Sequence, residues 1–150
     1  GRDGFAEETR ALFPPERTSF LGWTTPAEFF PQVDLLVYPT IGREAFGRAT
    51  IEAFSHAVPV ISTDIGGVAE NIEDGINGYH TPAGDAAALA ACIERIAASP
   101  EIYAQLSRGA LTAAQDYLEP SVCTLLETAL SQTLARHGGP VSRDLREAAR

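Results

Sequence analysis

Short apolar runs alternate with segments of helical periodicity along the first two-thirds of the chain. Residues 18–21, 34–38 and 58–62 combine β-branched, aromatic and leucine side chains and predict strands. The second run is almost wholly apolar, as a parallel strand buried on both faces is. Helices are predicted at about 26–32 and 48–57. This alternation is typical of an α/β protein with a Rossmann-like parallel sheet and helices on both faces.

The next segment is built around glycines. A short helix is predicted after Gly66 and Gly67. A turn at Asp74 and Gly75 then leads to a last short strand at 78–80. The predicted sheet ends with this strand, because the sequence beyond it has helical periodicity only.

From Asp85 onward the pattern is helical. Asp85 and Ser99 stand where helix N-caps are expected. A break at 119–121 precedes the strongest apolar stripe of the chain. The stripe consists of Val122, Leu125, Leu126, Ala129, Leu130 and Leu134. We therefore divide the chain into an α/β domain at 1–136, which ends in a helical segment, and a tail at 137–150, which we expect to be disordered.

Composition narrows the functional classes. The chain is 45% hydrophobic and 21% charged, which is typical of a globular domain. Its net charge is −9 and it has no basic cluster, so nucleic acid and anionic membranes are poor partners. All 11 basic residues are arginine, which excludes a P-loop lysine and a Schiff-base lysine. The chain has no methionine and begins at Gly1, and we expect it to be a piece of a longer protein.

The cysteines and histidines show no metal-binding spacing. Cys92 and Cys123 form no CxxC pair, which predicts reduced thiols in a cytoplasmic protein. His56, His80 and His137 are far apart, and none lies in an HExxH motif. We therefore predict no metal site.

The loop before the second predicted helix has the features of an anion site. A strand ends near Tyr38, a loop with Gly42 and Gly47 follows, and the helix begins near Arg48. The first N–H groups of such a helix, at Gly47, Arg48 and Ala49, have no intrahelical acceptor, and the helix dipole is positive there. Ligands of open α/β sheets bind at this edge.

Two carboxylates flank this anion site. Glu44 precedes the helix and Glu52 lies about one turn inside it. A carboxylate suits adjacent sugar hydroxyls better than phosphate, so the pattern indicates a nucleotide-sugar site. Alternatively, Glu44 is a solvated loop acid and Glu52 an acid favoured by the helix dipole. Gly66 and Gly67 offer a second cluster of free amides, or serve only as turn glycines.

The succession of motifs resembles the C-terminal, donor-binding domain of retaining glycosyltransferases of family four, which have the GT-B fold. The resemblance covers about residues 1–135, in the right order and spacing. The matching segments are Phe20-Leu21-Gly22, Asp34-Leu35-Leu36-Val37-Tyr38-Pro39, Glu44-x-Phe46-Gly47-x4-Glu52-Ala53, Pro59-Val60-Ile61, Gly66-Gly67, Glu70, Asp74-Gly75-x2-Gly78 and Asp85-x3-Leu89.

The resemblance implies a role for each matching position. Glu44 corresponds to the glutamate that faces the donor sugar at the reaction centre, and we take it as the catalytic residue. Glu52 corresponds to the glutamate that holds the ribose hydroxyls. The other donor-binding residues are Phe46, Gly47 and Arg48 for the sugar and diphosphate, Leu21 and Gly22 for the nucleobase, and Gly66 and Gly67 near the same edge.

The family transfers a sugar from a nucleoside diphosphate donor with retention of configuration and without a metal or other cofactor. The resemblance thus implies a hexosyltransferase, of which we expect this chain to lack the N-terminal GT-B domain and the N-terminal portion of the donor-binding domain. The Arg and Lys that the family places on the diphosphate would lie upstream of this chain. We expect this fragment to be inactive alone and to self-associate through its exposed interdomain surface. Arg43 or Arg48 could supply charge to the diphosphate, or each is a solvated surface arginine.

One departure from the family and two alternatives stay open. The family has a glycine where Ala57 stands, and a left-handed alanine costs about 1 kcal/mol, so we expect the helix to end differently. One alternative function is a non-catalytic nucleotide-binding or scaffold module. The other is a sugar-nucleotide epimerase relative, although that class lacks the Phe-Gly loop between two glutamates.

Overall fold

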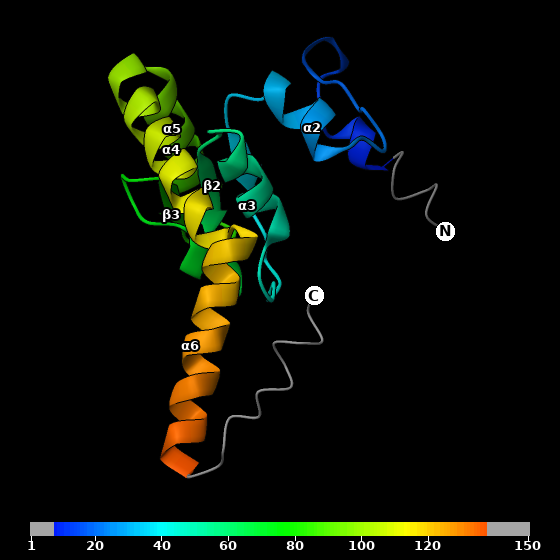
Figure 1. The fold of residues 1–150 in the computed structure, drawn as a ribbon. Coiled ribbons are helices and arrows are strands. Elements are labelled where there is room, and N and C mark those ends of the chain that lie inside the picture. Colours follow the sequence, from blue (N-terminus) through cyan, green and yellow to red (C-terminus); the bar gives the residue numbers. More distant parts are fainter. Residues whose placement is uncertain (1–7, 138–150) are drawn as a thin grey trace.

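The computed structural model describes residues 8–137, which form a three-stranded parallel sheet with helices around it (Figure 1). The strand order is β1-β2-β3. The strands are β1 (Leu36–Tyr38), β2 (Val60–Thr63) and β3 (Gly78–Thr81). Leu36 is aligned with Val60, which is in turn aligned with Gly78. The predicted α/β class with a parallel sheet is confirmed.

The helices follow the predicted order. The α-helices are α2 (Pro26–Phe29), α3 (Arg48–Ser55), α4 (Ala86–Ala97), α5 (Pro100–Ala114) and α6 (Glu119–His137). The short 3-10 helices are η1 (Pro15–Arg17), η2 (Phe30–Gln32), η3 (Gly67–Asn71) and η4 (Gln115–Tyr117). Both predicted caps are confirmed, because Asp85 accepts from the Ala88 amide at 2.9 Å and Ser99 from the Ile102 amide at 3.3 Å.

Helices cover both faces of the sheet, and β2 separates two apolar clusters. Val60 is fully buried in a cluster with Phe54 of α3 and Ala110 of α5. Its neighbour Ile61 is fully buried in the other cluster, with Ile96 of α4. Successive side chains of a strand point to opposite faces, so two adjacent residues anchor both layers. Covering of both faces was predicted and is confirmed.

The strand predicted at 18–21 was wrong. This segment is irregular, and within residues 8–137 no strand pairs with it. A strand needs a neighbouring ladder for its backbone groups, and short apolar content alone does not supply one. The aromatic ring of Phe20 instead packs edge-on against Phe13, with ring centroids 6.2 Å apart, and Arg10 lies over the same ring.

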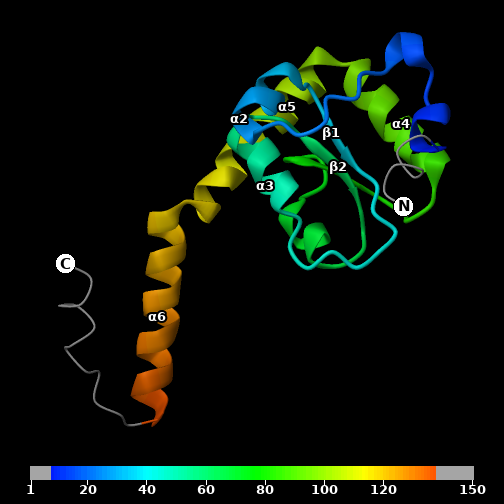
Figure 2. The same cartoon turned by 90° about the vertical axis from the view of Figure 1, so that its right-hand side faces the viewer.

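Helix α6 extends away from the sheet and its covering helices (Figure 2). Its predicted apolar stripe is exposed, with Leu125 70% and Leu130 61% accessible. No helix within residues 8–137 is both long enough and apolar enough to cross a membrane. Apart from the last residue of α6, the tail predicted at 137–150 lies outside the described residues.

Helix α3 ends at Ser55, and Ala57, just after the C-cap residue His56, adopts the left-handed conformation that glycine usually takes, so the expectation of a different ending was wrong. Ala57 has a φ of 58°, and it is the one non-glycine residue with positive φ among residues 8–137. Its amide donates to the Phe54 carbonyl at 2.9 Å, and the Val58 amide donates to Ala53 at 3.0 Å. The Ser107 hydroxyl also donates to the Ala57 carbonyl at 2.8 Å. These bonds hold the alanine in place despite its strain.

Replacing this alanine by glycine is expected to stabilise the protein. Ala57→Gly removes the Cβ strain of a left-handed residue and should raise the free energy of unfolding by about 0.5–1 kcal/mol, after the larger chain entropy of unfolded glycine is subtracted. Urea unfolding followed by circular dichroism measures this change. The control Ala90→Gly, at an exposed position within α4, should lower it by about 1 kcal/mol. A destabilising Ala57→Gly would contradict the strain argument.

Candidate functional site

The predicted site residues of the β1–α3 region gather at one edge of the sheet. The loop at 39–47 follows β1, and Asp64 opens the loop that follows β2. Because the strands are parallel, both loops leave the same carboxyl edge. Glu44, Phe46 and Gly47 lie on the first loop, and Gly66 lies on the second.

Glu44 is a half-buried carboxylate with fixed partners. The Tyr38 hydroxyl donates to its Oε2 at 3.3 Å, and the Gly47 amide donates to its Oε1 at 3.4 Å. Burial raises the pKa of Tyr38, and the charge of Glu44 raises it further, so the phenol stays protonated and donates. Glu44 is therefore held at the start of α3, and it is not a freely solvated loop acid.

Gly47 can be only glycine at the start of α3. It is buried, it is the N-cap, and its φ of 74° is left-handed. A Cβ at this position would lie 2.6 Å from Cγ2 of Val68. Beyond it, the amides of Arg48 and Ala49 contact no acceptor within residues 8–137. Two of the three predicted unpaired N–H groups, those of Arg48 and Ala49, are thus present. The third, at Gly47, donates to Glu44.

Arg48 and Glu52 form an ion pair on the outer face of α3. Arg48 Nη2 lies 2.8 Å from Glu52 Oε1, with the arginine side chain 84% and the glutamate side chain 30% accessible. An exposed pair of this spacing contributes only about 0.3–0.5 kcal/mol. Both groups can therefore exchange this contact for a ligand at small cost.

Gly66 and Gly67 allow the backbone at the start of η3 to approach the loop of Glu44 closely. A Cβ on Gly66 would lie 2.5 Å from the Glu44 carbonyl oxygen, and one on Gly67 would lie 2.0 Å from that of Ala45. The Gly67 amide donates to the Glu44 carbonyl at 2.8 Å. The expectation that this amide is free was therefore wrong, because the close approach of the two backbones leaves it paired.

Asn71 is a residue of this region that sequence reasoning missed. Its side chain is buried, and its Nδ2 donates to the carbonyl of Phe46 and, at 3.0 Å, to the Thr50 hydroxyl. The Tyr117 hydroxyl donates to its Oδ1 at 3.0 Å. No motif identifies this asparagine. The one signal in the sequence is that a polar residue stands directly before the apolar Ile72 in the short run that begins at Val68.

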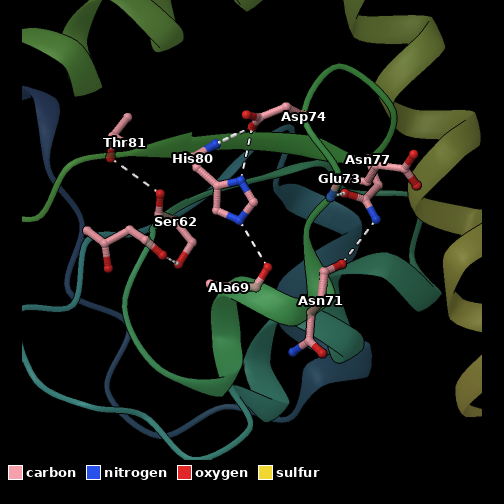
Figure 3. Close-up of polar contacts among 9 residues, drawn as sticks. Ser62, Ala69, Asn71, Glu73, Asp74, Asn77, His80 and Thr81 are labelled. Atoms are coloured by element: carbon pink, nitrogen blue, oxygen red, sulfur yellow. Dashed lines mark hydrogen bonds and ion pairs between the residues drawn. The ribbon is translucent and has the colours of Figure 1, made fainter.

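The segment that carries Asn71 is fastened to β3 (Figure 3). The ring of His80 places Nε2 3.0 Å from the Ala69 carbonyl and Nδ1 3.1 Å from Asp74 Oδ1. The Asn77 side chain donates to the Asn71 carbonyl at 3.1 Å. These contacts tie η3 to β3 and to the turn before it.

Leu21 and Gly22 line a hollow that neither glutamate lines. The hollow is open, with a volume of about 580 Å³, and its wall includes Phe29. The structure thus does not bring these two predicted nucleobase residues into one cavity with the glutamates. Within residues 8–137, no group of three His, Cys, Asp or Glu side chains is placed to hold a metal ion.

Alanine at Gly47 is expected to disrupt this loop. Gly47→Ala adds left-handed strain and a clash with Val68, and should lower the free energy of unfolding by about 2–4 kcal/mol. Gly42→Ala is the control in the same loop, because a Cβ there meets nothing within 4 Å. Urea unfolding of both variants checks this prediction. Equal stabilities would show that Val68 does not constrain the loop.

The sequence is similar to glycosyltransferases of known families. The family described as glycosyl transferases group 1 matches residues 2–99. A D-inositol 3-phosphate glycosyltransferase of Saccharomonospora viridis is 31% identical over 114 residues, 76% of this chain and 25% of that protein. The chain thus spans about a quarter of this curated relative.

Solved structures resemble the fold as well. Anabaena Alr3699/HepE in complex with UDP superposes with a TM-score of 0.76 and 25% identity, over 87% of this chain and 36% of that one. The same protein with UDP-glucose gives a TM-score of 0.75. Sucrose-phosphate synthase from Thermosynechococcus elongatus gives 0.71 with 26% identity, over 90% of this chain and 34% of that one.

Proposed function

The chain belongs to the group 1 glycosyl transferases, and from this premise we propose that its β1–α3 loop binds the nucleoside diphosphate sugar that donates a hexosyl group. The transfer proceeds with retention of configuration and without a metal or other cofactor. The chain is the donor-binding part of this enzyme, and the remaining domain supplies the acceptor site.

One observation carries the proposal, namely the unpaired amides of Arg48 and Ala49 between two carboxylates. The amides and the positive end of α3 suit a diphosphate. Glu44, held next to them by Tyr38, suits the hydroxyls of the donor sugar. Glu52, one turn along α3, suits the ribose hydroxyls.

In this proposal, donor binding breaks the Arg48–Glu52 ion pair. When ribose hydroxyls donate to Glu52, the exposed guanidinium of Arg48 is released and can turn toward the diphosphate. The exchange costs little, because an exposed ion pair contributes less than about 1 kcal/mol. Arg48 then adds to the charge of the cations that we expect upstream of this chain.

The proposal also covers the partners of this chain. We place the nucleobase near Leu21 and Gly22, where the open hollow beside Phe29 offers an apolar wall. We expect an N-terminal GT-B domain to complete the cleft, the isolated chain to be inactive and to self-associate, and the complete enzyme to act in the cytoplasm.

A second candidate is a nucleotide-binding module without transfer activity. The net charge of −9 favours it, because a site that relies on amides and one exposed arginine holds little charge to stabilise a leaving diphosphate. Nucleotide binding without transfer in the complete protein would distinguish this candidate from the first.

Calorimetry with UDP, GDP and ADP tests the binding half of the proposal. We expect UDP to bind the 150-residue chain in the micromolar range, since a similar solved structure holds UDP. Glu52→Ala should weaken binding about tenfold, or about 1.4 kcal/mol, by removing the partner of the ribose hydroxyls. Glu94→Gln, at an exposed position of α4, is the control and should leave affinity unchanged. If none of the three nucleotides binds, this chain does not form a usable donor site.

Kinetics of the complete enzyme test the catalytic half. Glu44→Gln keeps the shape of the side chain and removes its charge, so kcat should fall by roughly a hundredfold. The donor KM should change less than kcat, because the diphosphate contacts stay in place. Glu94→Gln again serves as the control. Unchanged sugar transfer in Glu44→Gln would remove this residue from the reaction centre.

A further inference from the structure

A buried polar network lies beneath the loop of the proposed donor site. Thr50 of α3 is 0% accessible and Asn71 of η3 is 6% accessible. Tyr117, at the end of η4, joins them through its hydroxyl. Three elements that are distant in sequence thus meet through side-chain hydrogen bonds. The bonds form a chain that ends on the backbone at the start of α3.

The bonds of this network have one direction. The Tyr117 hydroxyl donates to Asn71 Oδ1 at 3.0 Å. Asn71 Nδ2 donates to the Phe46 carbonyl and, at 3.0 Å, to Thr50 Oγ1, and the Thr50 hydroxyl donates to the Gly47 carbonyl at 2.7 Å. The orientation of the amide follows, because a carbonyl oxygen only accepts. Within residues 8–137 no buried side-chain N or O lacks a partner.

This network holds two carbonyls whose peptide groups also carry site amides, and the Gly47 carbonyl accepts from the Thr50 amide as well, at 2.9 Å. The Phe46 carbonyl and the Gly47 N–H belong to one peptide plane, and the Gly47 carbonyl and the Arg48 N–H belong to the next. In a trans peptide the C=O and N–H point in opposite directions, and residues 8–137 contain no cis bond. With both carbonyls drawn inward, the Gly47 and Arg48 amides must face outward, where Glu44 Oε1 lies 3.4 Å from the Gly47 nitrogen.

We propose that Asn71 and Tyr117 are positioning residues that aim the Arg48 amide at the donor diphosphate and the Gly47 amide at Glu44. The inference rests on the proposed function and adds two residues that would not touch the ligand. Burial raises the pKa of Tyr117, and Asp116 and Glu70 raise it further, so the phenol remains a donor at neutral pH. The Tyr117 ring also packs edge-on against Phe46, with centroids 5.8 Å apart.

Two substitutions disturb the network without a large change of shape. Tyr117→Phe removes the hydrogen bond that the buried Oδ1 of Asn71 accepts. Asn71→Asp places a carboxylate against the Phe46 carbonyl, and two acceptors repel each other at that distance. Both variants should let the two peptide groups turn. Ser107→Ala is the matched control, because it also removes one side-chain bond, to the Ala57 carbonyl at 2.8 Å, away from the loop.

Titration of the 150-residue chain with UDP and with uridine, followed in ¹H–¹⁵N spectra, tests the inference. Tyr117→Phe should weaken UDP binding about five- to tenfold, leave uridine binding unchanged, and shift the unliganded Gly47 and Arg48 resonances. Asn71→Asp should have larger effects of the same kind. Ser107→Ala should lose similar stability in urea and change neither the UDP-to-uridine ratio nor these two resonances.

A Tyr117→Phe variant overturns the inference if it loses stability as Ser107→Ala does, while the UDP-to-uridine ratio and the two amide resonances stay as in the parent chain. A parent chain that binds no nucleotide refutes the proposed function instead. In that case the unliganded spectra alone test the positioning: unshifted Gly47 and Arg48 signals in Tyr117→Phe overturn the inference, and shifted signals support it. If Asn71→Asp fails to fold, the Tyr117→Phe variant alone provides the test.

Discussion

The close approach of two backbones, the start of η3 and the β1–α3 loop, is the constraint on which the site depends. Gly66 and Gly67 permit it, because a Cβ on either would overlap the carbonyl of Glu44 or Ala45. The same approach puts Val68 against Gly47, which can then be only glycine. The loop is thus fixed by contact with a neighbouring segment, and its hydrogen bond from Gly67 to Glu44 is a consequence of that contact.

The chemistry of the site follows from this packing. An acidic chain with no lysine has few cations to offer the diphosphate of the proposed donor, so the proposed site relies mainly on oriented amides. Oriented amides act only when the backbone cannot turn away. Here η3 holds the loop through the bonds of Gly67 and Asn71 to loop carbonyls, and His80 and Asn77 of the β3 region in turn hold η3. The backbone of the proposed anion site is therefore tied through η3 to β3 and the turn before it.

Much of the fold could be predicted from local pattern, and the failures share a cause. Helices, caps and three strands depend on neighbouring residues, so periodicity and capping chemistry indicate them. The segment at 18–21 has the composition of a strand, yet a strand exists only where another strand pairs with it. Ala57 was expected to alter the end of α3, but the bonds from Ser107 and to Ala53 hold the left-handed conformation. In each case a distant partner decided the outcome.

The sequence by itself determined the order of the elements, the sheet edge at which the loops meet, and the two glutamates on either side of the start of α3. Those are properties of spacing along the chain. Only the tertiary structure decided that the Gly67 amide is paired and that Asn71 supports the Phe46 loop. Asn71 is 25 positions from Phe46 and 46 from Tyr117, so no local pattern records their contact. Hydrogen-bond partners of buried polar groups are chosen by packing, because every such group must be satisfied by whatever the fold brings near.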